Sequence, residues 1–195
     1  MSSVREDLPP TFTTATARRL GVHPRDLYSW RDSGEIVELS RGVFRRGDAP
    51  LPTYPDLLAV AQRSPRAIVC CLSAASIHEL TDEMPIELHI AVPKHSHPPV
   101  IDHPPVKVFR FEETTFELGL SFVDAAPHES VRVYDAARTV VDLMRFRRRF
   151  GEPNAHSALH RYLSSGRRPA LLLDYARALG SFGPMRSALD VAMAR

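Results

Sequence analysis

Arginine is the residue with the clearest chemical use in this chain of 195 residues, because lysine occurs only at positions 94 and 107. A guanidinium group donates paired hydrogen bonds to a phosphate or to the N7 and O6 atoms of guanine. The stretch ELSRGVFRR, residues 38–46, places three arginines around one glycine. A genome rich in G and C would also favour arginine over lysine, so the bias alone leaves both explanations open.

Nine residues near the N-terminus are candidates for contact with DNA. Arg25, Tyr28 and Ser29 occupy early positions of an expected helix, where side chains read base edges in the major groove, and His23 stands at its entrance. The two arginines before that helix suit phosphates, and those of ELSRGVFRR suit a minor groove at the tip and the DNA backbone beyond it. The alternative is a solvated basic surface. The nine are Arg18, Arg19, His23, Arg25, Tyr28, Ser29, Arg41, Arg45 and Arg46.

A histidine-rich loop invites a metal interpretation. The segment HSHPPVIDH brings His95, His97, Asp102 and His103 close together in sequence. Zinc sites draw their ligands from regular spacings supported by a second layer of hydrogen bonds. Here prolines space the ligands irregularly and no cysteine is near. We therefore expect a polar loop and no metal.

Catalytic motifs are absent from the sequence. It contains neither a GxxxxGK[ST] phosphate loop nor a GxSxG elbow. A nuclease-like site would need a lysine two residues after a carboxylate, and neither Lys94 nor Lys107 has one there. We expect no enzymatic activity and no cofactor.

Two short helices must position the DNA-contacting candidates. The segment FTTATARRLG predicts a helix with Thr13 as N-cap and Gly21 after its end, and Pro24 begins a second helix that closes at Gly34. Leu27 and Trp30, three residues apart, form the inward face of the second helix. Two short helices joined by a turn with glycine are typical of a helix-turn-helix.

A hairpin follows these helices directly. If Arg41 and Gly42 form the turn, Gly42 supplies the positive φ that the turn requires. The resulting register pairs Ser40 with Val43, Leu39 with Phe44 and Glu38 with Arg45, and places Val37 on the inward side with Leu39 and Phe44. The hairpin is then a wing attached to the helix-turn-helix.

The rest of the chain predicts an α+β fold: an N-terminal winged helix-turn-helix followed by a mixed α/β C-terminal domain that ends in a run of helices. We expect a DNA-binding domain at 1–48, a proline-rich linker at 49–55 and the C-terminal domain at 56–195. The strands are expected in AIVCCL, ELHIAVP, VKVFRF, ELGLSFVDA and ESVRVYD. The helices are expected in PDLLAVAQRS, SAASIHEL, YDAARTVVDLMRFRRRF, PNAHSALHRYL, RPALLLDYARAL and PMRSALDVAMA.

The apolar runs and the cysteines indicate the cellular compartment of the protein. No apolar run approaches the roughly 18 to 20 residues that span a bilayer. The N-terminus MSSVREDLPP lacks the apolar core of a secretory signal. Cys70 and Cys71 are adjacent in an apolar run, which suits buried thiols better than a disulfide framework. We expect a cytoplasmic protein without a membrane partner.

Four segments in this order resemble the AbiEi family of antitoxins of type IV toxin–antitoxin, or abortive infection, systems. The segments are TTATARRLGVHPRDLYSWRDSGEIVELSRGVFRR, LSAASIHELTDEMP, LHIAVPK and VYDAARTVVDLMRFRRRFG. The resemblance covers nearly the whole chain. It implies a winged helix that binds inverted repeats in the promoter of its own operon, and a C-terminal domain that counteracts a nucleotidyltransferase-like toxin, with or without direct contact. One departure is that Pro9 and Pro10 leave only SSVREDL for the helix that should come first.

A basic block in the C-terminal third suits contact with a partner. Net charge is only +2, yet residues 130–195 hold 12 Lys and Arg against 5 Asp and Glu. Within residues 130–195, Asp135–Arg138 and Asp142–Arg145 have the spacing of ion pairs on a solvated helix face. The remaining arginines, at 147, 148 and 149, have no such partner in sequence and are candidates for a partner contact, either with nucleic acid or with the toxin. The candidates are Arg147, Arg148 and Arg149.

The alternative function is a stand-alone winged-helix transcriptional regulator, whose C-terminal domain senses a ligand or forms oligomers. A toxin gene beside this gene would distinguish the two functions.

Overall fold

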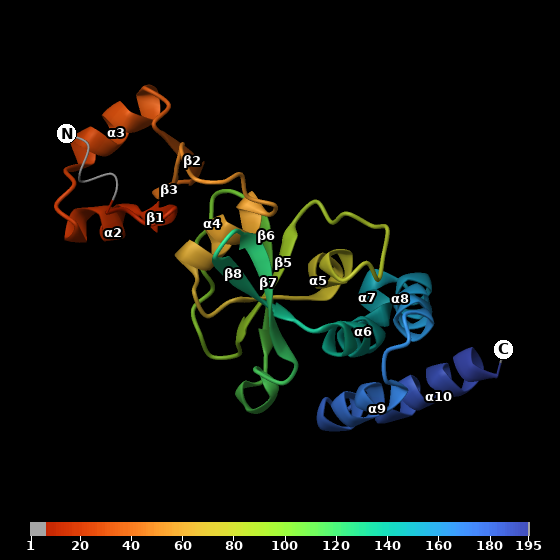
Figure 1. The fold of residues 1–195 in the computed structure, drawn as a ribbon. Coiled ribbons are helices and arrows are strands. Elements are labelled where there is room, and N and C mark those ends of the chain that lie inside the picture. The colour runs from red at the N-terminus through yellow and green to blue at the C-terminus, as the bar shows by residue number, and fades with distance from the viewer. Residues whose placement is uncertain (1–6, 195) are drawn as a thin grey trace. The chain divides into compact units, whose positions relative to one another are not determined.

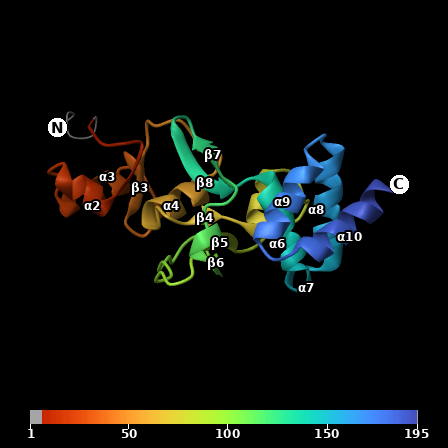
Figure 2. The ribbon, with the colours of Figure 1, turned by 90° about the horizontal axis from the view of Figure 1, so that it is seen from below.

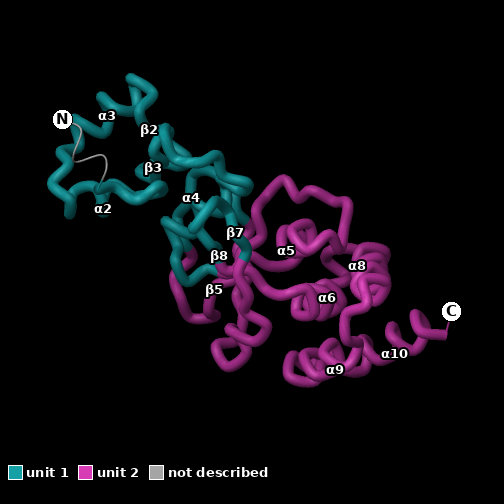
Figure 3. The backbone as a smooth tube through the Cα atoms, in the orientation of Figure 1, with its two compact units in different colours: residues 1–67, 99–106, 123–131 teal, residues 68–98, 107–122, 132–195 magenta. Residues whose placement is uncertain are grey.

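The computed structural model describes residues 7–194, so the short first helix expected within residues 2–8 lies almost entirely outside the described residues. The chain forms two sheets and several helices, and the predicted mixture of α and β structure is confirmed. It divides into two compact units (Figure 3). The first contains residues up to Ala67 together with Pro99–Val106 and Val123–Val131, and the second contains Ile68–Pro98, Lys107–Phe122 and Arg132 onward.

The first unit begins with three strands and two helices (Figure 1). Thr13 caps the first helix as expected, since its Oγ1 accepts a hydrogen bond from the Thr16 amide at 3.1 Å. The strands form an antiparallel sheet in the order β1-β3-β2. The elements are β1 (Thr11–Thr13), α2 (Thr14–Arg19), α3 (Pro24–Asp32), β2 (Ile36–Ser40) and β3 (Val43–Arg46). A small core lies between them, made of Leu8, Phe12, Ala17, Val22, Leu27, Ile36 and Phe44, with Trp30 packed against it.

The register of the β2–β3 hairpin differs from the predicted one. Ser40 does pair with Val43, but the register then shifts, so that Glu38 pairs with Phe44. Ile36 is buried in the core, whereas Val37, predicted on the inward side, is 53% exposed. The turn explains the shift: a Glu38 carboxylate oxygen accepts a hydrogen bond from the Gly42 amide at 3.0 Å, which makes Glu38 part of the turn. Gly42 has the expected positive φ, +73°.

The first unit continues past the predicted boundary at residue 48. Helix α4 (Pro55–Arg63) contacts β1, β2 and β3 and buries Leu57, Leu58, Ala59 and Val60. In the segment expected to be a linker, the Tyr54 amide donates a hydrogen bond to the Ala125 carbonyl at 3.1 Å. The segments that complete this unit therefore come from far along the chain.

The second sheet has five strands in the order β6-β5-β4-β8-β7. Its strands are β4 (Ile68–Val69), β5 (Leu88–Pro93), β6 (Val106–Phe111), β7 (Leu120–Ala126) and β8 (Glu129–Tyr134), with a 3-10 turn at Glu113–Thr115. Strand β4 is antiparallel to β5 and parallel to β8. The strand expected in AIVCCL ends early, because helix α5 (Cys71–Ile77) begins at the second cysteine, with Cys70 as its extended N-cap.

The helices of the final third are confirmed, with one break. The helix expected over YDAARTVVDLMRFRRRF divides at Phe146 into α6 (Ala136–Arg145) and α7 (Arg147–Phe150). Helices α8 (Glu152–Ser164), α9 (Pro169–Ala178) and α10 (Phe182–Met193) follow and gather around α6 (Figure 2). None of the helices within residues 7–194 has both the length and the apolar character that a membrane crossing requires.

Candidate nucleic-acid interface

Helix α3 presents its predicted contact residues to solvent. His23 is the N-cap, and its Nδ1 accepts a hydrogen bond from the Arg25 amide at 3.2 Å. Pro24 occupies the first turn, where its missing N–H costs nothing. Leu27 is buried in the core, while Arg25, Tyr28 and Ser29 are exposed on the other sides of the helix. The side chains predicted to read bases are thus free to meet a groove.

The end of α2 adds two exposed cations beside this helix. Arg18 and Arg19 occupy its last turn, where positive charge also suits the helix dipole. An Arg19 guanidinium nitrogen donates to Thr16 Oγ1 at 3.4 Å. Both guanidinium groups remain open to a phosphate.

Arg31 belongs to the same surface and was missed from the sequence. Its guanidinium lies 5.2 Å from the Tyr28 ring centroid, donates to Asp32 at 3.0 Å and reaches Glu38 at 3.4 Å. Hydrogen bonds to Asp32 and Glu38 raise the pKa of Arg31. The three-residue spacing from Tyr28 was the available signal. Arg31 thereby limits the orientations of the Tyr28 ring.

The tip of the β2–β3 hairpin carries one highly exposed arginine. The Arg41 side chain is 87% exposed and lies 3.7 Å from Asp102, which belongs to the first unit through the segment Pro99–Val106. An exposed pair at this distance contributes about 0–1 kcal/mol. Another anion can therefore replace Asp102 at little cost.

Arg45 corrects the sequence prediction. It is buried, and its Nη1 donates to Thr11 Oγ1 at 2.6 Å and to a Glu129 carboxylate oxygen at 2.5 Å. Its Nη2 donates to the Pro50 carbonyl. A side chain held in this way cannot contact the DNA backbone. Both faces of β3 are covered, since Val43, Phe44 and Arg45 are all buried, while Arg46 is half-buried and bonded to Asp48 at 2.6 Å.

The histidine-rich loop does not assemble into a cluster. Within residues 7–194, no three His, Cys, Asp or Glu side chains come together with metal-binding geometry. Among the four that suggested a metal, Asp102 faces Arg41.

The basic block at 145–149 is partly occupied by contacts of its own. Arg147 reaches Glu152 at 3.6 Å and donates to the Met144 carbonyl at 3.1 Å, so it has a partner that sequence reasoning missed. The Arg149 guanidinium lies 4.5 Å from the Phe109 ring centroid. Arg148 and Arg149 are exposed. The exposed part of the block is therefore smaller than predicted.

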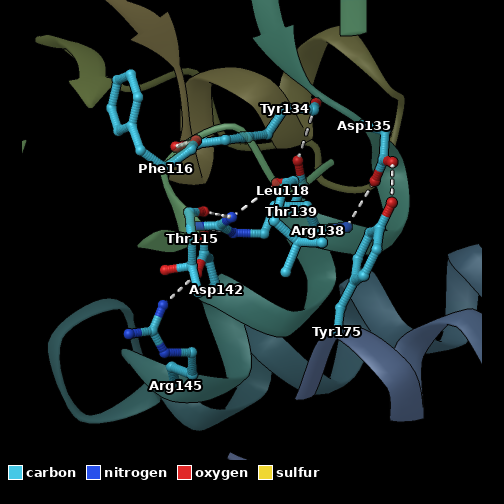
Figure 4. A network of polar contacts seen from close by, with 10 residues as sticks. All are labelled: Thr115, Phe116, Leu118, Tyr134, Asp135, Arg138, Thr139, Asp142, Arg145 and Tyr175. Atoms are coloured by element: carbon cyan, nitrogen blue, oxygen red, sulfur yellow. Dashed lines mark hydrogen bonds and ion pairs between the residues drawn. The ribbon is translucent and has the colours of Figure 1, made fainter. Parts of the chain in front are cut away.

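Of the two ion pairs expected on a solvated face of α6, Asp142–Arg145 forms at 2.7 Å, but its carboxylate is buried, and Asp135 bonds the Arg138 amide in place of its guanidinium. Arg138 and Asp142 are fully buried, and Arg138 Nε donates to Asp142 at 2.8 Å (Figure 4). Arg138 also donates to the carbonyls of Thr115 and Leu118, at 2.9 and 2.7 Å. Burial raises the pKa of Asp142, against the opposite effect of its arginine partners.

Neighbouring residues extend this hydrogen-bond network from the buried Arg138 to the half-buried Asp135 and Tyr175. Asp135 caps α6 by accepting from the Arg138 amide at 2.7 Å, and it also accepts from the Tyr175 hydroxyl at 2.9 Å. The Tyr134 hydroxyl donates to the Phe116 carbonyl at 2.6 Å, and its ring lies 4.2 Å from the Arg138 guanidinium. The DAARTVVDL block thus fastens α6 to the loop before β7.

Comparisons with known proteins match the segment that carries these residues and the fold of the chain. Residues 2–47 match the family described as "Transcriptional regulator, AbiEi antitoxin". The crystal structure of the RV2827C protein from Mycobacterium tuberculosis is similar over 97% of this chain and 78% of its own, with a TM-score of 0.52 and 18% identity. At that identity the likeness shows the fold alone. No curated protein sequence matches this chain.

Proposed function

We propose that this protein is the antitoxin of a type IV toxin–antitoxin system, because residues 2–47 match the family of AbiEi antitoxin transcriptional regulators. It counteracts a nucleotidyltransferase-like toxin and represses its own operon by binding inverted repeats in the promoter. It acts in the cytoplasm, without enzymatic activity of its own. The family match is the observation that carries the proposal.

The arrangement of the first elements supports the DNA-binding half. Helices α2 and α3, followed by a hairpin whose second strand pairs with β1, have the element order of a winged helix-turn-helix. In that fold α3 enters the major groove and the β2–β3 hairpin is the wing. Arg25 reads a guanine edge, with Tyr28 and Ser29 beside it, and His23 at the helix entrance approaches the backbone. Arg18, Arg19 and Arg46 contact phosphates, and Arg41 reaches the minor groove.

The remaining chain supplies the antitoxin half. The helices around α6 form a core of their own, which does not depend on the residues that face DNA. Arg148 and Arg149 give that half an exposed basic surface, next to Arg147, for a partner. This half either binds the toxin directly through that surface or counteracts it without direct contact.

Promoter preference tests the first half. Full-length protein is titrated against a labelled duplex of its own promoter and against a random duplex of equal length, at about 150 mM salt, where non-specific phosphate binding is weakened. We expect tighter binding to the promoter. Equal affinity for the two duplexes would contradict the proposal.

Toxin rescue tests the second half. Cells that express the neighbouring toxin should survive when the full chain is co-expressed, and should also survive with an Arg25→Ala, Arg41→Ala double variant that no longer represses. Matched expression levels are checked by immunoblot. Poisoned cells despite a folded full-length chain would contradict the antitoxin role.

A stand-alone regulator is the second candidate. A groove of about 270 Å³ between α8 and α10, lined by His156, Leu159, His160, Ala188, Val191 and Ala192, would suit a ligand-sensing domain. The absence of a toxin gene beside this gene would favour it.

A further inference from the structure

A buried ion pair holds the second strand of the hairpin. The side chains of Arg45 and Glu129 are only 5% and 15% exposed, and the pair closes at 2.5 Å. The two residues are 84 positions apart in sequence, yet both belong to the first compact unit. Arg45 completes its bonding with Thr11 and with the Pro50 carbonyl.

Arg45 occupies the central position of its sheet. In β3 it pairs across to Thr11 of β1 on one side and to Val37 of β2 on the other. The strand begins at Val43, directly after Gly42 and the exposed Arg41. Whatever fixes the Arg45 side chain therefore fixes the strand that leads to the hairpin tip.

Removing the carboxylate would leave a guanidinium charge buried without a counter-charge, which is far costlier than losing an exposed pair. The strand can relieve that charge by moving Arg45 toward water, and the hairpin tip would move with it. The core under α3 joins Leu27 to Ala17 and Val22, which lie outside both the hairpin and the ion pair. The helix contact with DNA can therefore survive while the hairpin contact is lost.

We propose that Glu129 is a positioning residue for DNA binding: through Arg45 it holds the β2–β3 hairpin so that Arg41 reaches the DNA. The proposal rests on the proposed DNA-binding function. Glu129 lies outside the predicted DNA-binding domain, 1–48, and it would position Arg41, which lies inside that domain.

A double-mutant cycle on the full-length chain tests this role. Binding to the promoter duplex is measured for the parent, Glu129→Gln, Arg41→Ala and the double variant, at several salt concentrations. Loss of one charge-assisted contact predicts roughly tenfold to hundredfold weaker binding for each single variant. Because both changes remove the same contact, the double variant should bind about as well as either single one.

Non-additive effects of Glu129→Gln and Arg41→Ala on binding distinguish a positioning role of Glu129 from a purely stabilising one. A carboxylate that only stabilised the fold would leave the Arg41→Ala effect undiminished in the Glu129→Gln background, once the folded fraction is fixed by a stoichiometric titration. Asp124→Asn is the matched control, since it neutralises a carboxylate between Val123 and Val131 that bonds Ser130 at 2.8 Å. It should bind like the parent.

Glu129→Asp keeps the test decisive if Glu129→Gln does not fold, because it retains the charge but shortens the reach to Arg45. It should weaken binding less and still diminish the Arg41→Ala effect. Additive effects, or parental affinity in a folded Glu129 variant, overturn the positioning role. A parent chain that shows no promoter preference instead overturns the proposed function.

Discussion

At the scale of single residues, the roles of three arginines follow from the carboxylate that each one contacts. Arg41 lies 3.7 Å from Asp102 in an exposed pair, which leaves its guanidinium accessible to a partner. Arg45, four positions on, is committed to Glu129 inside the protein, and Arg138 is committed to Asp142. Arg41 and Arg45 looked alike in sequence, and Arg138 was expected on a solvated face, because local spacing does not reveal burial or a partner 84 residues away.

Arg25→Ala and Arg41→Ala should weaken promoter binding in different ways. Loss of a base-edge contact at Arg25 should cost roughly 1–3 kcal/mol per half-site and relax sequence preference at one position. Loss of Arg41 should weaken all sequences about equally and reduce the salt slope by about one unit. Titrations at several salt concentrations measure both effects. Parental binding by Arg41→Ala would mean that the charge at the hairpin tip does not serve DNA.

His89 should make stability depend on pH. Burial, with smaller effects of Lys107 and Arg149, lowers the pKa of His89 to about 4, and its ring packs against Phe109 and Phe150. The unfolded chain takes up this proton near pH 6.5 and the folded chain only near pH 4. The contribution of neutral His89 to the free energy of unfolding is therefore fully present above pH 6.5 and is lost as the pH falls toward 4.

Urea unfolding of the parent should show a loss on the order of 2–3 kcal/mol from this group across that window. His89→Leu should show a flatter dependence. Some slope should remain, because burial also lowers the pKa of His78. If the free energy of unfolding of His89→Leu depended on pH as that of the parent does, His89 would not be the cause of the pH dependence.

At the scale of elements, helix ends were more predictable than strand pairing. The Thr13 and Pro24 signals act within one turn of the chain and were confirmed. The hairpin register was wrong because it depends on Glu38 folding back onto the Gly42 amide. The solvated face predicted for α6 was wrong because Arg138 turns inward to Asp142 and to the carbonyls of the loop before β7, contacts that the i,i+3 spacing does not encode.

Gly119 tests how closely that loop approaches α6. A Cβ at Gly119 would lie 2.6 Å from Arg138 Cβ, and its φ is +76°. Gly166 has a similar φ, +72°, with nothing within 4 Å of an added Cβ. Both alanine variants should lose roughly 1 kcal/mol from backbone strain, and Gly119→Ala a further 1–3 kcal/mol from the clash. Chemical denaturation compares them directly; equal losses would show that the loop moves aside.

At the scale of the whole molecule, the chain is not organised as two successive domains. The unit that contains the residues proposed to contact DNA also contains α4 and segments beyond residue 98. Composition pointed to a boundary near the prolines after residue 48. The proline-rich stretch instead supplies the Pro50 carbonyl to Arg45, a contact that no local pattern encodes.

A fragment of residues 1–48 should therefore fold poorly and bind DNA weakly. It lacks Glu129 and the Pro50 carbonyl for Arg45, and it lacks α4 against its sheet. Circular dichroism and anisotropy titration beside the full chain measure both properties. A fragment that melts cooperatively and binds the promoter like the parent would show that the later segments are dispensable.

The paired cysteines at the start of α5 have a practical consequence for labelling. Both thiols are free and fully buried, and burial together with a hydrogen bond involving Cys71 raises the pKa of Cys70. Maleimides react with accessible thiolates, so the folded parent chain is a silent background. A Tyr28→Cys variant, at a position 56% exposed on α3, would carry a single fluorophore without removal of either native cysteine.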